Sequence, residues 1–275
     1  MKKVIELNLF NDFWIDCQQK NILSVLTTAN RSYKTAAAMN NYIYGVGGRS
    51  GWYKSVTVDY KKDERNFMSF VERKEFDFPP DCDYIEELKK CIDCGRLISI
   101  RVDLFYWNPL NILYHQVHVN HFSMCFGYDD EEQCLYFDDE AQNEDGFLKV
   151  PYERVRKALV FNEGKLFGIE SVCLSDIPDY EYSLGAIIEN AEKLTENLSC
   201  ALYTTAWSDF GRKEDISMSV TDMSKLFNRQ TANVVLFKAL MEKGFISEEA
   251  FLKYSAGFNE KGKAENEQKR LCGAC

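Results

Sequence analysis

The stretch 121-HFSMCFGYDDEEQCLYFDD-139 contains two apolar runs that are separated by a short acidic turn. In 121–129 the large apolar side chains occupy every second position, and 134–139 continues with a second run. A period of two is typical of a strand with one buried face, and two such strands joined by a short polar turn form a hairpin. The stretch therefore predicts an antiparallel hairpin with strands at 121–129 and 134–139.

The residues around this hairpin predict further strands and short helices. In 97–105, LISIRVDLF, apolar and polar residues alternate as they do in a strand. The segment 83–95 is typical of a short helix that ends at Gly95, a residue suited to the position after a helix. A helix is predicted at 152–160, and a last strand at 165–174. These elements indicate an α+β fold with an antiparallel sheet.

The composition of the chain changes beyond Pro178, where β signals become rare. Helical periodicity dominates three segments, namely 184–206, 220–242 and 247–254. The polar segment 259–275 is typical of a flexible tail. The predicted organisation is a catalytic domain at 1–176, a helical C-terminal region at 177–258 and a flexible tail at 259–275.

An amphipathic helix is predicted at 17–29, because apolar residues recur there at helical spacing. Asp16 is a suitable N-cap residue, which would place Cys17 in the first turn. The positive end of a helix dipole favours a thiolate at that position. Cys17 is therefore the candidate nucleophile among the ten cysteines.

The three histidines of the chain all lie within 115-HQVHVNH-121, so histidine-based catalysis must use one of them. His121 opens a predicted strand. If paired residues of the hairpin sum to 261, Ser123 faces Asp138, and His121 shares a face with Asp138. A change of register by one residue would turn Asp138 to the other face and leave Asp139 as the candidate.

The sequence thus favours a triad of Cys17, His121 and Asp138. The imidazole would stabilise the thiolate, and the carboxylate would orient the imidazole. Each residue, taken singly, also has an ordinary structural explanation. For Cys17, that explanation is the common burial of free cysteines in protein cores. The joint arrangement is what favours catalysis.

The segments Asp16-Cys17, HFSMCFGYDD and LYFDD together resemble the papain-like cysteine superfamily. The resemblance is closest to the butirosin-biosynthesis-H-type acyltransferases and more distant to C39-type peptidases. It implies a papain-like cysteine-protease fold, with an antiparallel sheet and an N-terminal catalytic helix, followed by a helical extension. It also implies that the amide of Asn11, six residues before Cys17, helps to form an oxyanion hole.

The resemblance further implies an acyltransferase that moves an acyl or aminoacyl group from a carrier-protein thioester to an amine in natural-product biosynthesis. The partners would be an acyl or peptidyl carrier protein, which supplies the pantetheine arm, and a small amine acceptor. No further cofactor is expected, and a homo-oligomer is left open. The basic residues Lys89, Lys90, Arg96 and 154-RVRK-157 are candidates for docking the carrier.

Two alternatives remain for the same fold. One is a cysteine peptidase, amidase or thioester hydrolase that uses the same triad. Gln18 disfavours the peptidase, because C39-type sequences have glycine at this position. The other is a non-catalytic binding protein that retains the fold.

Composition excludes some classes of function. The formal net charge is −10, with 33 Lys and Arg against 43 Asp and Glu. A general nucleic-acid or anionic-membrane binder would need a positive balance. The start of the chain has no signal-peptide pattern, and no run of about 18 apolar residues could span a membrane. We therefore expect a cytoplasmic protein with reduced thiols.

Two patterns in the sequence could supply metal ligands, but no metal site is expected at either. The pattern H-x-x-H-x-x-H at 115–121 could hold a metal on a helix, but the stretch is typical of a loop and strand. The C-x-x-C pairs at 91–94 and 272–275 are too far apart for an ordinary zinc ribbon. The glycine cluster in 42–56 lacks the strand and helix of a nucleotide-binding motif and predicts a loop.

Four further residues are weak candidates for substrate binding. Arg101 and Asp103 lie on the polar face of the 97–105 strand. Trp107 and Tyr114 belong to the long connection that follows this strand, which we expect to be mobile or to form a pocket.

Overall fold

The structure is a computed structural model, and it describes residues 1–13, 17–40, 42–47, 55–60, 72–73, 82–139, 146–162, 165–166, 170–208 and 220–256. These residues form two compact units. The first takes in Met1–Asn11, Asp16–Arg31 and Asn66–Asp179, and the second takes in Asp12–Ile15, Ser32–Arg65 and Tyr180–Cys275. Helices combine with antiparallel sheets, which confirms the predicted α+β class.

The first unit is built on an antiparallel sheet in the order β4-β11-β5-β6-β7-β8, with β1 paired to β6. The strands are β1 (Lys2–Val4), β4 (Glu72–Arg73), β5 (Arg96–Asp103), β6 (Asn120–Asp129), β7 (Cys134–Asp138), β8 (Leu148–Pro151) and β11 (Glu170–Cys173). A separate pair joins β9 (Phe161–Asn162) to β10 (Lys165–Leu166). The predicted last strand is therefore represented by β10 and β11, and 167–169 lies outside the described residues.

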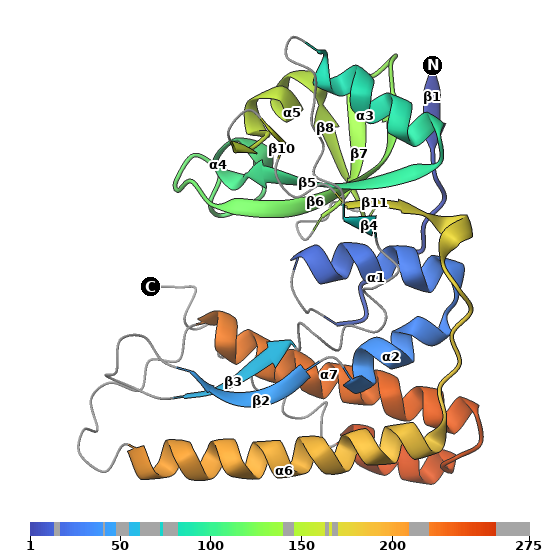
Figure 1. The fold of residues 1–275 in the computed structure, drawn as a ribbon, viewed down its shortest axis with the longest axis vertical. Coiled ribbons are helices and arrows are strands. Elements are labelled where there is room, and N and C mark those ends of the chain that lie inside the picture. The colour runs from blue at the N-terminus through green and yellow to red at the C-terminus, as the bar shows by residue number, and fades with distance from the viewer. Residues whose placement is uncertain are drawn as a thin grey trace. The chain divides into compact units, whose positions relative to one another are not determined.

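Helices cover both faces of this sheet. Figure 1 shows α1 (Cys17–Ala29) on one face, and α3 (Tyr84–Asp93) and α5 (Tyr152–Ala158) on the other. The predicted helix at 17–29 and the predicted hairpin are confirmed. Asp83 caps α3 by accepting a hydrogen bond from the Ile85 amide at 2.9 Å, and Gly95 follows the helix with φ of +75°. The main core lies between the sheet, α3 and α5.

The strand predicted at 97–105 ends earlier, at Asp103. The carboxylate of Asp103 accepts a hydrogen bond from the Phe105 amide at 3.0 Å and so caps the short helix α4 (Leu104–Trp107). An aspartate at an N-cap satisfies an amide that the first helical turn leaves unpaired. The local hydrogen bond therefore outweighs the β propensity of the apolar residues that follow.

The register of β6 changes along its length. Cys125 pairs with Phe137, but Gly127 pairs with Tyr136, so β6 carries an irregularity around Phe126. The backbone of β1 approaches Gly127 closely, because a Cβ built there would lie 2.9 Å from the Lys3 carbonyl oxygen. Glycine is the residue that permits this approach.

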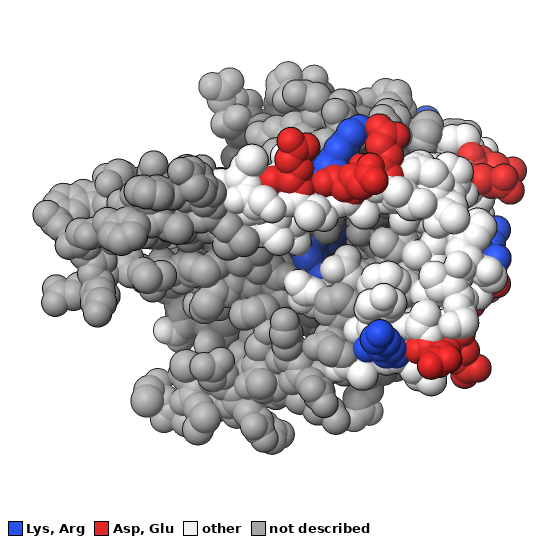
Figure 2. Space-filling model, turned by 90° about the horizontal axis from the view of Figure 1, so that it is seen from below, with Lys and Arg blue, Asp and Glu red and all other residues white. Residues whose placement is uncertain are grey.

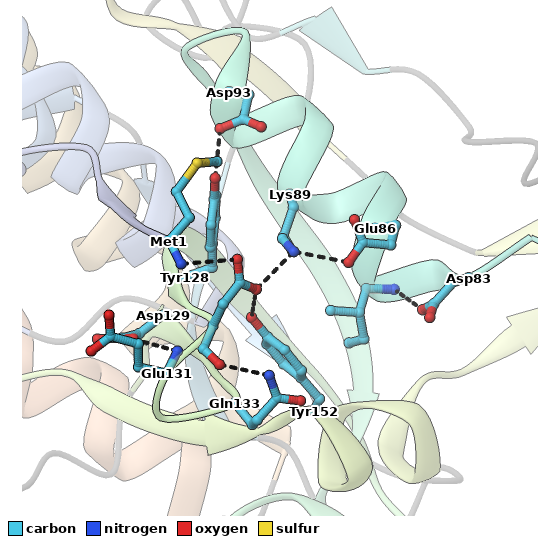
Figure 3. A network of polar contacts seen from close by, with 12 residues as sticks. Met1, Asp83, Glu86, Lys89, Asp93, Tyr128, Asp129, Glu131, Gln133 and Tyr152 are labelled. Carbon is cyan, nitrogen blue, oxygen red and sulfur yellow. Dashed lines mark hydrogen bonds and ion pairs between the residues drawn. The ribbon is translucent and has the colours of Figure 1, made fainter.

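A polar network ties the β6–β7 turn to the helices around it (Figure 3). Asp130 accepts hydrogen bonds from Lys89 of α3 at 2.7 Å and from the Tyr152 hydroxyl of α5 at 2.9 Å. Lys89 also pairs with Glu86 at 2.8 Å. The Met1 ammonium lies 3.5 Å from Asp130. The network thus connects β1, α3 and α5 at one end of the hairpin.

The second unit contains α2 (Ser32–Asn40), β2 (Tyr42–Gly47), β3 (Ser55–Tyr60), α6 (Leu184–Ser208) and α7 (Val220–Glu242), and residues 248–256 are also helical. The three predicted C-terminal helices are confirmed. Helix α6 packs against β2, and α7 packs against β3. Ile187 and Leu240 form a small buried cluster. The domain borders predicted at 176 and 258 stay predictions.

The loop predicted at 42–56 is wrong where the structure describes it. Residues 42–47 and 55–60 form an antiparallel pair in which Gly45 faces Thr57 and Gly47 faces Ser55. Tyrosine and valine alternate with the glycines, and their preference for strands outweighs the glycine signal. Gly48 and Gly51 lie outside the described residues, as do Asp16 and the predicted tail. None of the described helices is both long and apolar enough to cross a membrane.

Candidate functional site

The structure brings Cys17 and His121 together in the first unit. Cys17 is the first residue of α1 and is partly buried, so its thiol lies at the positive end of the helix. His121 is the second residue of β6, and only 7% of it is exposed. The Cys17 thiol is close enough to His121 to contribute to raising the pKa of the imidazole. A thiol and an imidazole are thus neighbours, whereas 104 residues separate them along the chain.

Asp139 is the carboxylate beside this pair. It follows directly after β7, and its Oδ2 lies 3.5 Å from the His121 Nε2. The indole Nε1 of Trp107 donates a hydrogen bond of 2.7 Å to the same oxygen. Trp107 is fully buried, and Asp139 is 2% exposed. A rigid buried ring therefore fixes the carboxylate that faces the histidine.

The predicted pairing of Ser123 with Asp138 is wrong. Met124 faces Asp138 instead, so this part of the hairpin follows a register shifted by one residue. A shift of one residue reverses which face of a sheet each side chain takes. Asp138 consequently turns away from His121, and Asp139, the alternative third residue, takes the position beside it.

Asp138 is held by α1 on the other side of the hairpin. Lys20 donates a hydrogen bond to its Oδ1, and the Ser24 hydroxyl donates one of 2.5 Å to its Oδ2. All three side chains are buried. Lys20 also donates to the Asp139 carbonyl oxygen at 3.3 Å. The polar side of α1 is thereby attached to the end of β7, three residues along the helix from Cys17.

Electrostatics distinguish the two aspartates. Burial works to lower the pKa of His121, but the neighbouring Asp139 carboxylate and Cys17 thiol outweigh it and raise the pKa to about 10. Burial also works to raise the pKa of Asp139, yet the nearby His121 and the hydrogen bond from Trp107 hold this pKa below its usual value. Burial raises the pKa of Asp138, against the opposing effect of Lys20. The charged imidazolium is thus favoured between Asp139 and the thiol.

Asn11 is not placed beside this group by the described contacts. It is exposed and lines a pocket of about 820 Å³ together with residues of the N-terminal segment, Thr28, Phe126 and Phe147. Neither Cys17 nor His121 is among the described lining residues. The role of Asn11 in an oxyanion hole stays a prediction.

The four weak substrate-binding candidates have separate environments. Trp107 supports Asp139 from inside the core and is too deeply buried to form an accessible substrate wall. Asp103 caps α4 and bonds to the His118 Nδ1 at 2.6 Å. The guanidinium of Arg101 lies 5.5 Å from the Phe122 ring centroid. Tyr114 lines a pocket beside α5.

Several of the basic residues expected to dock a carrier already have acidic partners. Lys90 pairs with Glu87 at 2.6 Å, and Arg156 pairs with Asp83 at 2.9 Å. Lys89 belongs to the network around Asp130. On the face drawn in Figure 2, the described charged side chains stand in small mixed groups separated by uncharged surface. A docking surface for an acidic carrier stays a prediction.

The described part of the chain contains no group of three or more His, Cys, Asp or Glu side chains that could hold a metal ion. His115 and His118 are exposed, and His118 is bonded to Asp103. Cys91 and Cys94 are free thiols, whereas Cys272 and Cys275 lie outside the described residues.

Comparison with known proteins adds little to this geometry. No protein-family profile matches the chain, and no curated protein matches it. A solved structure described as a C39-like peptidase from Bacillus anthracis matches with 19% identity and a TM-score of 0.35, covering 62% of this chain and 98% of that chain. The site is therefore interpreted from its own residues.

Sequence reasoning missed the role of Lys20, of Ser24 and of the Trp107 indole. A signal for the first two was present, because Lys20 and Ser24 are one helical turn apart within a segment that also carries the apolar residues Ile22, Leu23, Val25 and Leu26. Such a polar pair on a buried helix face indicates a buried partner. The bond between Trp107 and Asp139 joins residues 32 apart, and no local pattern predicts it.

Proposed function

We propose that the chain is a cysteine-dependent acyltransferase with a papain-like site formed by Cys17, His121 and Asp139. The observation that carries the proposal is the joint placement of a helix-start thiol, a buried imidazole with a raised pKa and a buried carboxylate held by Trp107. Groups of this kind activate a nucleophile by proton transfer and by orientation of the base. The carrier-protein donor and the amine acceptor are proposed from the sequence resemblance.

The reaction would have two halves. The Cys17 thiolate attacks the carbonyl carbon of a thioester, and the C–S bond to the donor breaks as the Cys17 acyl-enzyme forms. The departing thiolate takes the proton from His121. An amine then attacks the acyl-enzyme, His121 accepts a proton from the nitrogen, and the Cys17 thiolate leaves. The amide product and the free donor thiol balance the reaction.

Asp139 would keep the imidazole oriented through both halves. Its Oδ2 faces Nε2, which leaves Nδ1 of His121 to exchange the proton with Cys17. The backbone amide of Cys17, at the start of α1, is a candidate donor to the oxyanion. A cysteine hydrolase would use the same residues and would differ only in admitting water at the second half.

A first experiment tests the nucleophile. One equivalent of iodoacetamide at pH 6 should alkylate Cys17 selectively, because an ordinary thiol has a pKa of about 8.5 and is almost fully protonated there. Burial raises the pKa of Cys125 to about 12 and also raises the pKa of Cys91, so these thiols should not compete. The variant C94S, which removes an exposed thiol, is the control. Uniform labelling of all thiols would contradict the proposal.

A second experiment distinguishes transfer from hydrolysis. A carrier protein loaded with a labelled acyl group is mixed with the chain, and intact mass is measured with and without an added amine. An adduct on Cys17 that persists until the amine arrives supports transfer. Rapid release of the free acid assigns the same triad to a hydrolase instead. Absence of any adduct, with C17A behaving identically, overturns both.

A further inference from the structure

A second pocket of the first unit lies between α4, the connection that follows it and α5. Its volume is about 460 Å³, which falls within the range of small-molecule sites. None of Cys17, His121 and Asp139 is among its described lining residues. The pocket is therefore a candidate site separate from the cysteine chemistry.

The wall formed by residues 108–119 is held in place by short turns. Asn108 Oδ1 accepts a hydrogen bond from the Leu110 amide at 3.0 Å, and Asn111 Oδ1 accepts one from the Leu113 amide at 2.9 Å. The His115 amide donates to the Phe105 carbonyl oxygen at 3.1 Å. These bonds attach the connection to α4, so the wall exists before any ligand arrives.

Aromatic rings form one side of the pocket. The rings of Tyr114 and His115 stack with centroids 4.0 Å apart at an angle of 15°. The Tyr106 ring meets His115 edge-on at 6.5 Å. His115 adopts φ of +57°, a conformation that favours glycine, so its ring is presented by a backbone that other contacts must hold. His115 covers one face of the Tyr114 ring and its centroid also lies 5.2 Å from that of the Phe105 ring, so a further planar ring would stack on the other face of Tyr114.

Two cations form the other side. Arg154 and Lys157 of α5 line the pocket, and neither forms an ion pair with any residue in the described part of the chain. Arg156, on the same helix, instead bonds to both carboxylate oxygens of Asp83 at 2.9 and 3.1 Å. Glu153 is the one carboxylate among the described lining residues, so the lining carries a net positive charge.

We propose that this pocket binds a small planar ring carrying a phosphate or carboxylate, such as a nucleoside monophosphate. The ring would lie against the face of Tyr114 that His115 does not cover, and the anion would be held by Arg154 and Lys157. A guanidinium suits this role, because its planar fork matches the geometry of phosphate and carboxylate. Binding at this pocket is separate from acyl transfer and involves no covalent step.

Isothermal titration calorimetry of the full chain tests the proposed pocket. The variant C17A is used, so that the binding result does not depend on whether the proposed cysteine chemistry is correct. AMP should bind at least about 10-fold more tightly than adenosine or inorganic phosphate, because only AMP supplies both the ring and the anion. Phenyl phosphate distinguishes a simple aryl anion from a nucleotide as the ligand. Equal binding of phenyl phosphate assigns an aryl anion, and tighter binding of AMP assigns a nucleotide. No binding of either overturns the proposal.

Variants then locate the site. R154Q should weaken binding of the tighter probe about 10-fold, whereas the matched variant R156Q should stay within about twofold. Y114L should weaken it about fivefold or more through loss of stacking. A loss with R156Q as large as that with R154Q would show that general surface charge binds the anion, and the pocket assignment would fall.

Discussion

Two consecutive carboxylates at the end of the hairpin, those of Asp138 and Asp139, differ in the partners that hold them. On one side, Asp138 is closed in by Lys20 and Ser24 of α1. On the other, Asp139 is bonded to Trp107 and faces His121. Both carboxylates are almost fully buried. Burial alone therefore does not distinguish the two carboxylates, but their partners do. Lys20 attaches Asp138 to α1, whereas a histidine next to a thiol makes Asp139 the candidate for a catalytic role.

The largest expected effect is on stability at the Asp138 side. K20M removes the cation and leaves a buried carboxylate, which should lower the free energy of unfolding by about 3–5 kcal/mol. Denaturation followed by tryptophan fluorescence measures this. The matched variant K34M breaks an exposed pair with Asp12 and should cost no more than about 1 kcal/mol.

The double variant K20M/D138L sharpens this prediction. Replacing both members of a buried pair with apolar groups is often close to neutral. Most of the stability lost in K20M should therefore return. An equal loss in the single and double variants would mean that Lys20 acts through packing and not through its charge.

The next effect is on reactivity at the Asp139 side. In D139N the imidazolium loses its carboxylate, so burial lowers the pKa of His121 and the thiolate loses its counter-charge. Alkylation of Cys17 at pH 6 should slow about 10- to 100-fold, since each unit of pKa changes the ion-pair population tenfold. D138N should change this rate less than about threefold while it lowers stability. The reverse pattern would exchange the roles of the two aspartates.

A smaller effect concerns Gly127, which follows the irregularity that sets the register. In G127A the new methyl group would meet the Lys3 carbonyl oxygen at 2.9 Å and the Val4 Cα at 3.1 Å. Backbone atoms cannot easily move aside, so the free energy of unfolding should fall by about 1–3 kcal/mol. G185A, in α6 with nothing within 4 Å, should not destabilise the protein. Equal stability of G127A and wild type would show that β1 can shift freely.

A further effect is the pH dependence of stability. The pKa of His121 is raised from 6.5 to about 10, so the folded state holds this proton more tightly than the unfolded chain does. The stabilisation is fully present below about pH 6.5 and is lost as the pH rises towards 10. Wild type should therefore lose more stability over this window than H121Q. Equal losses in wild type and H121Q would contradict the raised pKa of His121.

Local patterns predicted much of the first unit. Helix α1 and the β6–β7 hairpin have strong periodicity, and their positions were predicted closely. The register of the hairpin was not predicted. The irregularity near Phe126 adds one residue to β6, and the alternation of apolar and polar residues in the sequence does not reveal it. The choice between Asp138 and Asp139 depended on that residue. The attachment of Trp107 to Asp139 depends on packing between distant segments, which periodicity does not contain.

The short strand β1 has a consequence for association between molecules. Strand β5 pairs with β6 from Asn120 to Cys125, and β1 pairs with β6 from Gly127 to Asp129. Three residues at the start of the chain thus satisfy backbone groups that β5 does not reach. Without them, an exposed strand edge would be available to a second chain, which is a common route to aggregation. In this sense β1 protects the solubility of the fold, however little it adds to the core.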